Sequence, residues 1–173
     1  MYKRQPLCFT VDDRGVGHFY GHPKVSAELA ETACRRLRME KRTSHQVVTL
    51  VQWHDRDIPR TEKAIARAVH QLGEGTFRQL LAVKRADNLA QHPDYRYRLA
   101  DIDRAEEILN TLLEKQACFS LRDLAVNGRD LTALGLRGPA IGQTLNALLA
   151  QVMDGALPNQ RDALLNAARH TIG

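Results

Sequence analysis

Short β-prone runs around a turn, the pattern typical of paired strands, end near residue 20 of this chain, and this limits its fold more than any other feature. The stretch LCFTVDDRGVGHFY, residues 7–20, has two short β-prone runs around a polar turn, a composition typical of a small hairpin. Beyond it, apolar residues recur at helical spacing, beginning with Val25, Leu29, Ala33 and Leu37. The sequence therefore predicts an all-α helical bundle preceded by a short N-terminal β-hairpin.

Caps and breakers divide the helical part into segments. We expect helices over about 23–39, from 43 or 44 to the QWHD sequence, over 61–72, over 76–91 and from 101 onward. Thr61 opens the third of these, Gly73 and Gly75 break it, and Thr76 caps the fourth. The second contains the nearly all-apolar run VVTLV and is therefore expected to be buried.

The character of the sequence changes at Ser120, where Asn-Gly, Leu-Gly and Gly-Pro pairs separate short helical segments. The segment GLRGPAIG leads into a helix with an apolar face, and Asn159 is expected to cap a final helix. These features predict two lobes, residues 1–118 with the hairpin and residues 119–173.

Composition restricts the possible partners. Hydrophobic residues make up 43% of the 173 positions, enough for a core without disulfides, and the net charge of +5 makes nucleic acid a reasonable partner. Aromatic residues are only 5%, which argues against stacking on single strands. Cys8, Cys34 and Cys118 have no paired spacing, and no leader or membrane-spanning apolar run is evident, so we expect a cytoplasmic protein without a membrane partner.

Candidate metal ligands are histidines and aspartates at the ends or faces of the expected helices: His18, His22, His54, Asp55 and Asp87. Metals that catalyse phosphate chemistry use mixed His and carboxylate sets with an open position for water. The alternative is that each His is a core or helix-terminal residue bonded to a backbone carbonyl. Asp87 could equally form an ion pair with Lys84 or Arg85 on its own helix.

A second candidate site lies where LRGPAIG begins a helix. Free N–H groups and the helix dipole form an anion site at such a point, and Arg129 and Arg137 flank it. We therefore expect Arg129, Arg137, Gly138 and Gly142 to contact RNA. The alternative is an ordinary interhelical turn in which the glycines allow close packing.

Four separated blocks, in order, resemble one known family: FTVDDRGVGHFYGHPKVSAELAE, IPRTEKAIARAVHQLGE, KRADNLAQ and FSLRDLAVNGRDLTALGLRGPAIGQTLNALLAQVMDGALPN. They are similar to the C-terminal part of bacterial tRNA nucleotidyltransferases of the HD-domain type, the CCA-adding and poly(A) polymerase family. The resemblance covers nearly the whole chain. It implies a degenerate HD-like helical lobe followed by a lobe that holds the body of tRNA.

Two departures from this family bear on function. The nucleotidyltransferase head, with its glycine-serine turn and paired metal-binding aspartates, has no counterpart here. The His-Asp-Ile-Gly-Lys-Pro sequence usual before the Cys-Phe-Thr run is replaced by MYKRQPLCFT, which retains only Pro6. By resemblance, His22, His54 and Asp87 line the remnant of an HD metal site, with His18 and Asp55 as neighbours. We expect this remnant to bind a divalent metal weakly or not at all.

The preferred interpretation is a headless tRNA nucleotidyltransferase fragment that binds the backbone of tRNA or another structured RNA. On its own it would not be an enzyme, and its partners would be RNA and a separate nucleotidyltransferase head. One alternative is a metal-dependent HD-type phosphohydrolase acting on a phosphomonoester or cyclic phosphate through a rebuilt site. Another is a degenerate chain that folds and has no activity.

Overall fold

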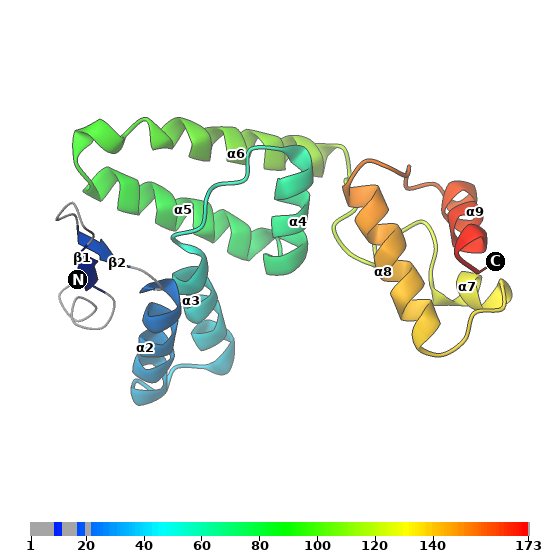
Figure 1. Cartoon of the computed structure of the whole chain (residues 1–173), viewed down its shortest axis with the longest axis horizontal. Helices are drawn as coiled ribbons and strands as arrows, with labels where there is room; N and C mark the ends of the chain where they lie inside the picture. The colour runs from blue at the N-terminus through cyan, green and yellow to red at the C-terminus, as the bar shows by residue number, and fades with distance from the viewer. Residues whose placement is uncertain (1–8, 12–16, 20–21, 173) are drawn as a thin grey trace. The chain divides into compact units, whose positions relative to one another are not determined.

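A computed structural model describes residues 9–11, 17–19 and 22–172, with the side chains of 24–94 and 96–170. This part of the chain is helical apart from two short strands, so the predicted all-α fold is confirmed (Figure 1). Strands β1 (Phe9–Val11) and β2 (Gly17–Phe19) pair antiparallel, with Phe9 opposite Phe19. The turn expected between them, residues 12–16, lies outside the described residues.

The helices follow in chain order: α2 (His22–Arg36), α3 (Lys41–Trp53), α4 (Glu62–Leu72), α5 (Glu74–Ala90), the 3₁₀-helix η1 (Pro93–Tyr95), α6 (Arg98–Glu114), α7 (Gly128–Ala133), α8 (Pro139–Met153) and α9 (Arg161–Ile172). Thr61 caps α4 as expected, since its Oγ1 accepts a hydrogen bond from the N–H of Ala64 at 3.2 Å. None of the helices in this part of the chain is long and apolar enough to cross a membrane.

Several helix ends differ from the expectations. Helix α3 begins at Lys41 with Glu40 at its N-cap position, so neither Thr43 nor Ser44 caps it, and α6 begins at Arg98, three residues before the expected start. Helix α2 ends at Arg36 because Arg38 adopts a left-handed conformation with a φ of 51°. Helix α5 begins at Glu74, not at Thr76, because Gly73 alone makes the turn at a φ of 76°. Asn159 does not cap α9: its Oδ1 accepts from the N–H of Ala125 at 2.8 Å, and its Nδ2 donates to the carbonyl of Asp123 at 2.7 Å.

The chain divides into two compact units. Unit 1 comprises residues 1–57 and 78–99, and unit 2 comprises residues 58–77 and 100–173. Helices α5 and α6 therefore each contribute to both, which differs from a simple division after residue 118. The expected lobe boundary at 118 and 119 stays a prediction.

In unit 1, α2 packs against α3, and Gln46 on α3 donates from Nε2 to Oε1 of Gln79 at 2.6 Å. The expectation that α3 is buried is wrong, because no residue of this helix is buried. Its run of valines and leucine is only half-buried. An apolar pattern predicts which face of a helix turns inward, but not how completely that face is covered.

Unit 2 contains a compact cluster of buried side chains in its C-terminal part. Helices α7, α8 and α9 enclose a cluster of buried side chains: Cys118, Leu124, Val126, Leu131, Leu136, Leu148, Leu149, Leu164, Leu165 and Ala168. Helix α4 is joined to the end of α8 by Asp154, whose carboxylate lies 3.0 Å from Nζ of Lys63 and 2.8 Å from Nη2 of Arg67. These contacts hold the C-terminal end of α8 against α4.

Candidate functional site

The candidate RNA-binding residues lie around the first turns of α7 and α8, and the start of α7 is held by a capping box. Oδ1 of Asn127 accepts from the N–H of Arg129 at 2.8 Å, and the carboxylate of Asp130 accepts from the N–H of Asn127 at 2.9 Å. Nη2 of Arg161 donates to the same carboxylate at 2.8 Å. The N–H of Asn127 and the guanidinium of Arg161 lower the pKa of Asp130. The first turn of α7 is therefore fixed by groups of this chain itself.

The start of α8 is different. Its N-cap is Gly138, no side chain makes a capping hydrogen bond, and Pro139 in the first turn has no N–H to satisfy. Gly138 adopts a φ of 58° and a ψ of −137°, a conformation that is open essentially to glycine alone. This end of α8 therefore presents backbone N–H groups without a side-chain cap from the described residues.

The two helix starts lie beside each other. A Cβ atom built on Gly128 would come within 3.4 Å of Cγ2 of Ile141, so the first turn of α7 packs on the first turn of α8. Arg129 follows Gly128 directly, and Arg137 directly precedes Gly138. Both arginines are exposed, and neither pairs with any described residue. The fold thus places two uncompensated guanidinium groups at one end of the helices of unit 2.

The glycines of this segment do not serve close packing within the chain. A Cβ atom at Gly138 or at Gly142 would meet no atom within 4 Å, and both residues are exposed. Gly138 is required by its backbone conformation. Gly142 has an ordinary helical conformation and open space in front of it. The glycine that does pack closely is Gly128, which the sequence analysis did not single out.

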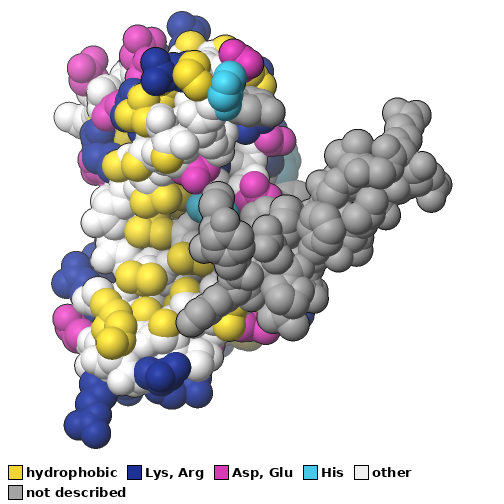
Figure 2. Space-filling view, turned by 90° about the vertical axis from the view of Figure 1, so that its left-hand side faces the viewer, with side chains coloured by type: hydrophobic (Ala, Val, Ile, Leu, Met, Phe, Trp, Pro, Cys, Tyr) yellow, Lys and Arg dark blue, Asp and Glu magenta, His cyan; other side chains and the backbone are white. Residues whose placement is uncertain are grey.

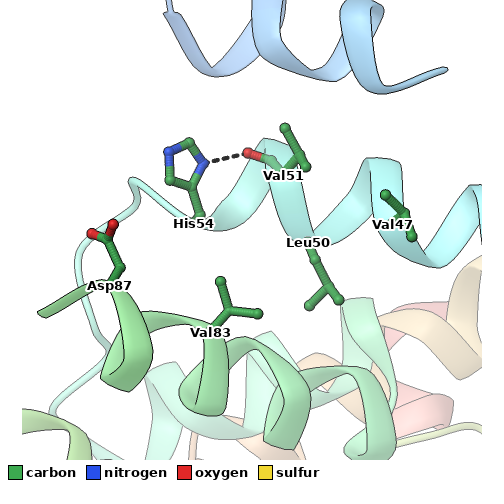
Figure 3. A pocket seen from close by; sticks show the side chains of 6 residues that line it. All are labelled: Val47, Leu50, Val51, His54, Val83 and Asp87. Atoms are coloured by element: carbon green, nitrogen blue, oxygen red, sulfur yellow. Dashed lines mark hydrogen bonds between the residues drawn. The ribbon is translucent and has the colours of Figure 1, made fainter. Parts of the chain in front are cut away.

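The residues expected around the metal-site remnant are partly brought together in unit 1. An open pocket of about 320 Å³ is lined by Val47, Leu50, Val51 and His54 from α3 and its end, and by Val83 and Asp87 from α5 (Figure 3). Figure 3 shows His54 and Asp87 at the same end of this pocket, with Val47 at the other end. Its wall is mostly aliphatic.

Hydrogen bonds orient both polar residues of the pocket. Nδ1 of His54 lies 2.5 Å from the carbonyl oxygen of Val51, which favours the tautomer that carries its proton on Nδ1. Oδ2 of Asp87 accepts from Nε2 of Gln91 at 2.8 Å. The contact of His54 with a backbone carbonyl agrees with the alternative of a helix-terminal histidine.

The donor set of the described residues does not fit a hydrolytic metal ion. Asp55 is exposed and does not line the pocket, while the side chains of His18 and His22 lie outside the described residues. Among the side chains that are described, no group of three His, Cys, Asp or Glu residues is arranged to hold a metal. His54 and Asp87 alone fall short of the three protein ligands that catalytic zinc sites use.

A residue that the sequence analysis mentioned only as an ion-pair partner has a larger role here. Nζ of Lys84, on α5, donates to the carbonyl oxygen of His54 at 2.7 Å and to the carbonyl oxygen of Arg56. Lys84 therefore holds the turn after α3 against α5. A lysine three residues before an aspartate on a helix is too common a pattern to have revealed this contact.

Known proteins resemble this chain over most of its length. Residues 19–168 match the family model described as tRNA nucleotidyltransferase domain 2. A CC-adding tRNA nucleotidyltransferase of Thermus thermophilus is 29% identical over 161 residues, which are 92% of this chain and 36% of that protein. The chain thus spans about a third of the length of this relative. No solved structure matches it. Because the family model covers most of the chain, the protein belongs to the tRNA nucleotidyltransferase family, through the region described as domain 2.

Proposed function

We propose that this chain holds structured RNA, and tRNA in particular, by its backbone phosphates, and that it adds no nucleotides by itself. The relative in Thermus thermophilus is named for acting on tRNA, and this chain corresponds to about a third of it. No glycine-serine turn with paired aspartates occurs in the 173 residues. Nucleotide addition would therefore require a nucleotidyltransferase head in addition to them.

The observation that carries the proposal is the pair of exposed, uncompensated arginines where α7 and α8 begin. Guanidinium groups and free backbone N–H groups are the usual donors to phosphate oxygens. The net charge of +5 adds a general attraction for polyanions, and the low aromatic content leaves few platforms for base stacking. We assign this binding to the lobe 119–173, whose helices α7, α8 and α9 enclose the buried cluster from Cys118 to Ala168.

The test compares tRNA binding by three proteins over a series of salt concentrations. In the variant with Arg129→Ala and Arg137→Ala, the affinity should fall, and the slope of log K against log salt should decrease by about one for each arginine. The control variant carries Arg42→Ala and Arg104→Ala, which remove two exposed arginines far from α7 and α8 in the sequence. Its net charge is the same as that of the first variant. It should bind nearly as the parent does.

Two results would contradict the proposed site. If both double variants lose affinity for tRNA by the same factor, the binding depends on net charge and not on the arginines at the starts of α7 and α8. If the parent binds an unstructured single strand as tightly as tRNA, shape and phosphate spacing are not being recognised. A separate assay with ATP, CTP, magnesium and tRNA lacking its CCA end should show no extension, and robust extension would disprove the statement on nucleotide addition.

The alternative function is a metal-dependent phosphohydrolase, favoured by the presence of His54 and Asp87 in one pocket. It would need further ligands from side chains outside the described residues, such as His18 and His22. Hydrolysis of a phosphomonoester that depends on added metal and disappears in His54→Ala would support this alternative.

A further inference from the structure

The ammonium group of Lys84 contacts the turn that follows α3. Lys84 lies on α5, and its Nζ donates hydrogen bonds to the carbonyl oxygens of His54 and Arg56, two residues that are not in a helix. An ammonium group has three donors, so two of them are satisfied by backbone oxygens. Carbonyl oxygens that converge on one positive charge are also the arrangement by which proteins bind metal cations.

Three carboxylates act electrostatically on this ammonium group. Burial lowers the pKa of Lys84, while the charges of Asp55, Asp57 and Asp87 act in the opposite direction. Asp55 and Asp57 belong to the turn that Lys84 holds, and Asp87 lies on α5 at the end of the pocket with His54. The positive charge that these carboxylates would otherwise attract from solution is therefore supplied by the chain.

We propose that the Lys84 ammonium takes the place of a metal ion in unit 1. It fastens the turn at residues 54–57 to α5, neutralises the carboxylates around it, and keeps divalent cations out of the pocket with His54 and Asp87. This accounts for the mismatch between a pocket that contains two conventional ligands and a donor set that, among the described side chains, is too small for a metal. The inference concerns unit 1 alone and does not depend on RNA binding.

Manganese provides the probe, because it is divalent and accepts carboxylate and imidazole ligands. Calorimetry at neutral pH should find no stoichiometric Mn²⁺ binding by the parent chain. Lys84→Met keeps the apolar stem and removes the charge, and it should raise the affinity for Mn²⁺ at least about tenfold, because affinity follows the charge of the ligand set. Adding Asp87→Asn to Lys84→Met should abolish this gain.

Lys115→Met is the matched control. Lys115 is exposed and lies 3.3 Å from Oε1 of Glu62 in unit 2, so the same substitution there changes net charge equally. It should leave Mn²⁺ binding unchanged. Lys84→Arg, which keeps the charge, should bind no more Mn²⁺ than the parent.

The parent chain alone decides the matter if Lys84→Met does not fold. The melting temperature of the parent chain should be the same in Mn²⁺ and in chelator, since a ligand that binds only the folded state would raise the melting temperature. The proposal is overturned if the parent binds one Mn²⁺ per chain and Asp87→Asn weakens that binding. It is equally overturned if folded Lys84→Met shows the affinity of the parent.

Discussion

Units 1 and 2 bury their hydrophobic side chains to very different extents. Among the described residues, the buried hydrophobic side chains of unit 1 are Cys34, Leu80 and Leu81, and all the others belong to unit 2. The large hydrophobic side chains left exposed show the reverse distribution. Those of unit 1 are Leu29, Leu37, Met39, Val83, Leu89 and Tyr97, whereas unit 2 contributes Leu121.

The comparison of α3 with α4 shows where the difference originates. Both are amphipathic, but α4 buries Ile65, Ala66, Ala68 and Val69, whereas α3 buries no residue. The face of the molecule in Figure 2 accordingly shows hydrophobic side chains between charged ones. Since exposed apolar area forgoes roughly 25 cal/mol for each Å², unit 2 should be the more stable of the two.

The largest expected effect comes from truncating one leucine in each unit. Leu164 on α9 is completely buried, so Leu164→Ala should lower the free energy of unfolding of unit 2 by about 2–5 kcal/mol. Leu50 on α3 is only half-buried, so Leu50→Ala should cost about 1 kcal/mol or less. Urea denaturation measures both. Equal losses of unfolding free energy in the two variants would contradict the difference in burial between the units.

A smaller effect is expected from two glycines of the same segment. Gly138→Ala forces a side chain into a conformation that costs about 1–3 kcal/mol. Gly142→Ala should instead stabilise α8 by about 0.5–1 kcal/mol, since alanine restricts the unfolded chain and meets no neighbour here. Thermal unfolding should show opposite shifts for the two variants. A shift of the same sign would mean that the start of α8 has a different backbone conformation.

Unit 2 should also lose stability in acid through two carboxylates. Lys63 and then Arg67 lower the pKa of Asp154, and the N–H of Asn127 and Arg161 lower that of Asp130. Each contribution is present above the ordinary pKa of 3.8 and is lost as the pH falls through the lowered pKa of the folded state.

The melting temperature of the parent should therefore fall between about pH 5 and pH 2 more than that of the variant carrying Asp130→Asn and Asp154→Asn. Glu107→Gln, at an exposed position of α6, is the control and should follow the parent. Parallel curves for parent and double variant would show that these two carboxylates contribute no pH-dependent stability.

The sequence was sufficient to predict the all-α fold class and the positions of several helix ends. Thr61 and the Gly-Pro pair at 138 and 139 act through local hydrogen bonds and backbone angles, so their positions alone predicted α4 and α8. Arg38 and Gln116 adopt positive φ values that are usual for glycine, and no local pattern indicates this. Asn159 was misassigned because it bonds residues more than 30 positions away.

The candidate sites divide in the same way. The sequence alone indicated Arg129 and Arg137, because both are basic residues close to a helix that begins after a glycine. The packing of Gly128 on Ile141 depends on tertiary structure and could not be predicted in this way. The presence of His54 and Asp87 in one pocket was expected from the family resemblance and not from their spacing. Lys84 was missed because its contacts join α5 to a turn about 30 residues earlier.

Hydrogen exchange with and without tRNA tests the central claim most directly, because it locates the bound RNA on the chain. Addition of tRNA at low salt should slow exchange in peptides that cover residues 127–142, where α7 and α8 begin. It should leave peptides from the second half of α3, residues 47–53, unchanged, since that half carries no basic side chain. Protection confined to unit 1, or no protection at a tRNA concentration that saturates binding, would contradict the account.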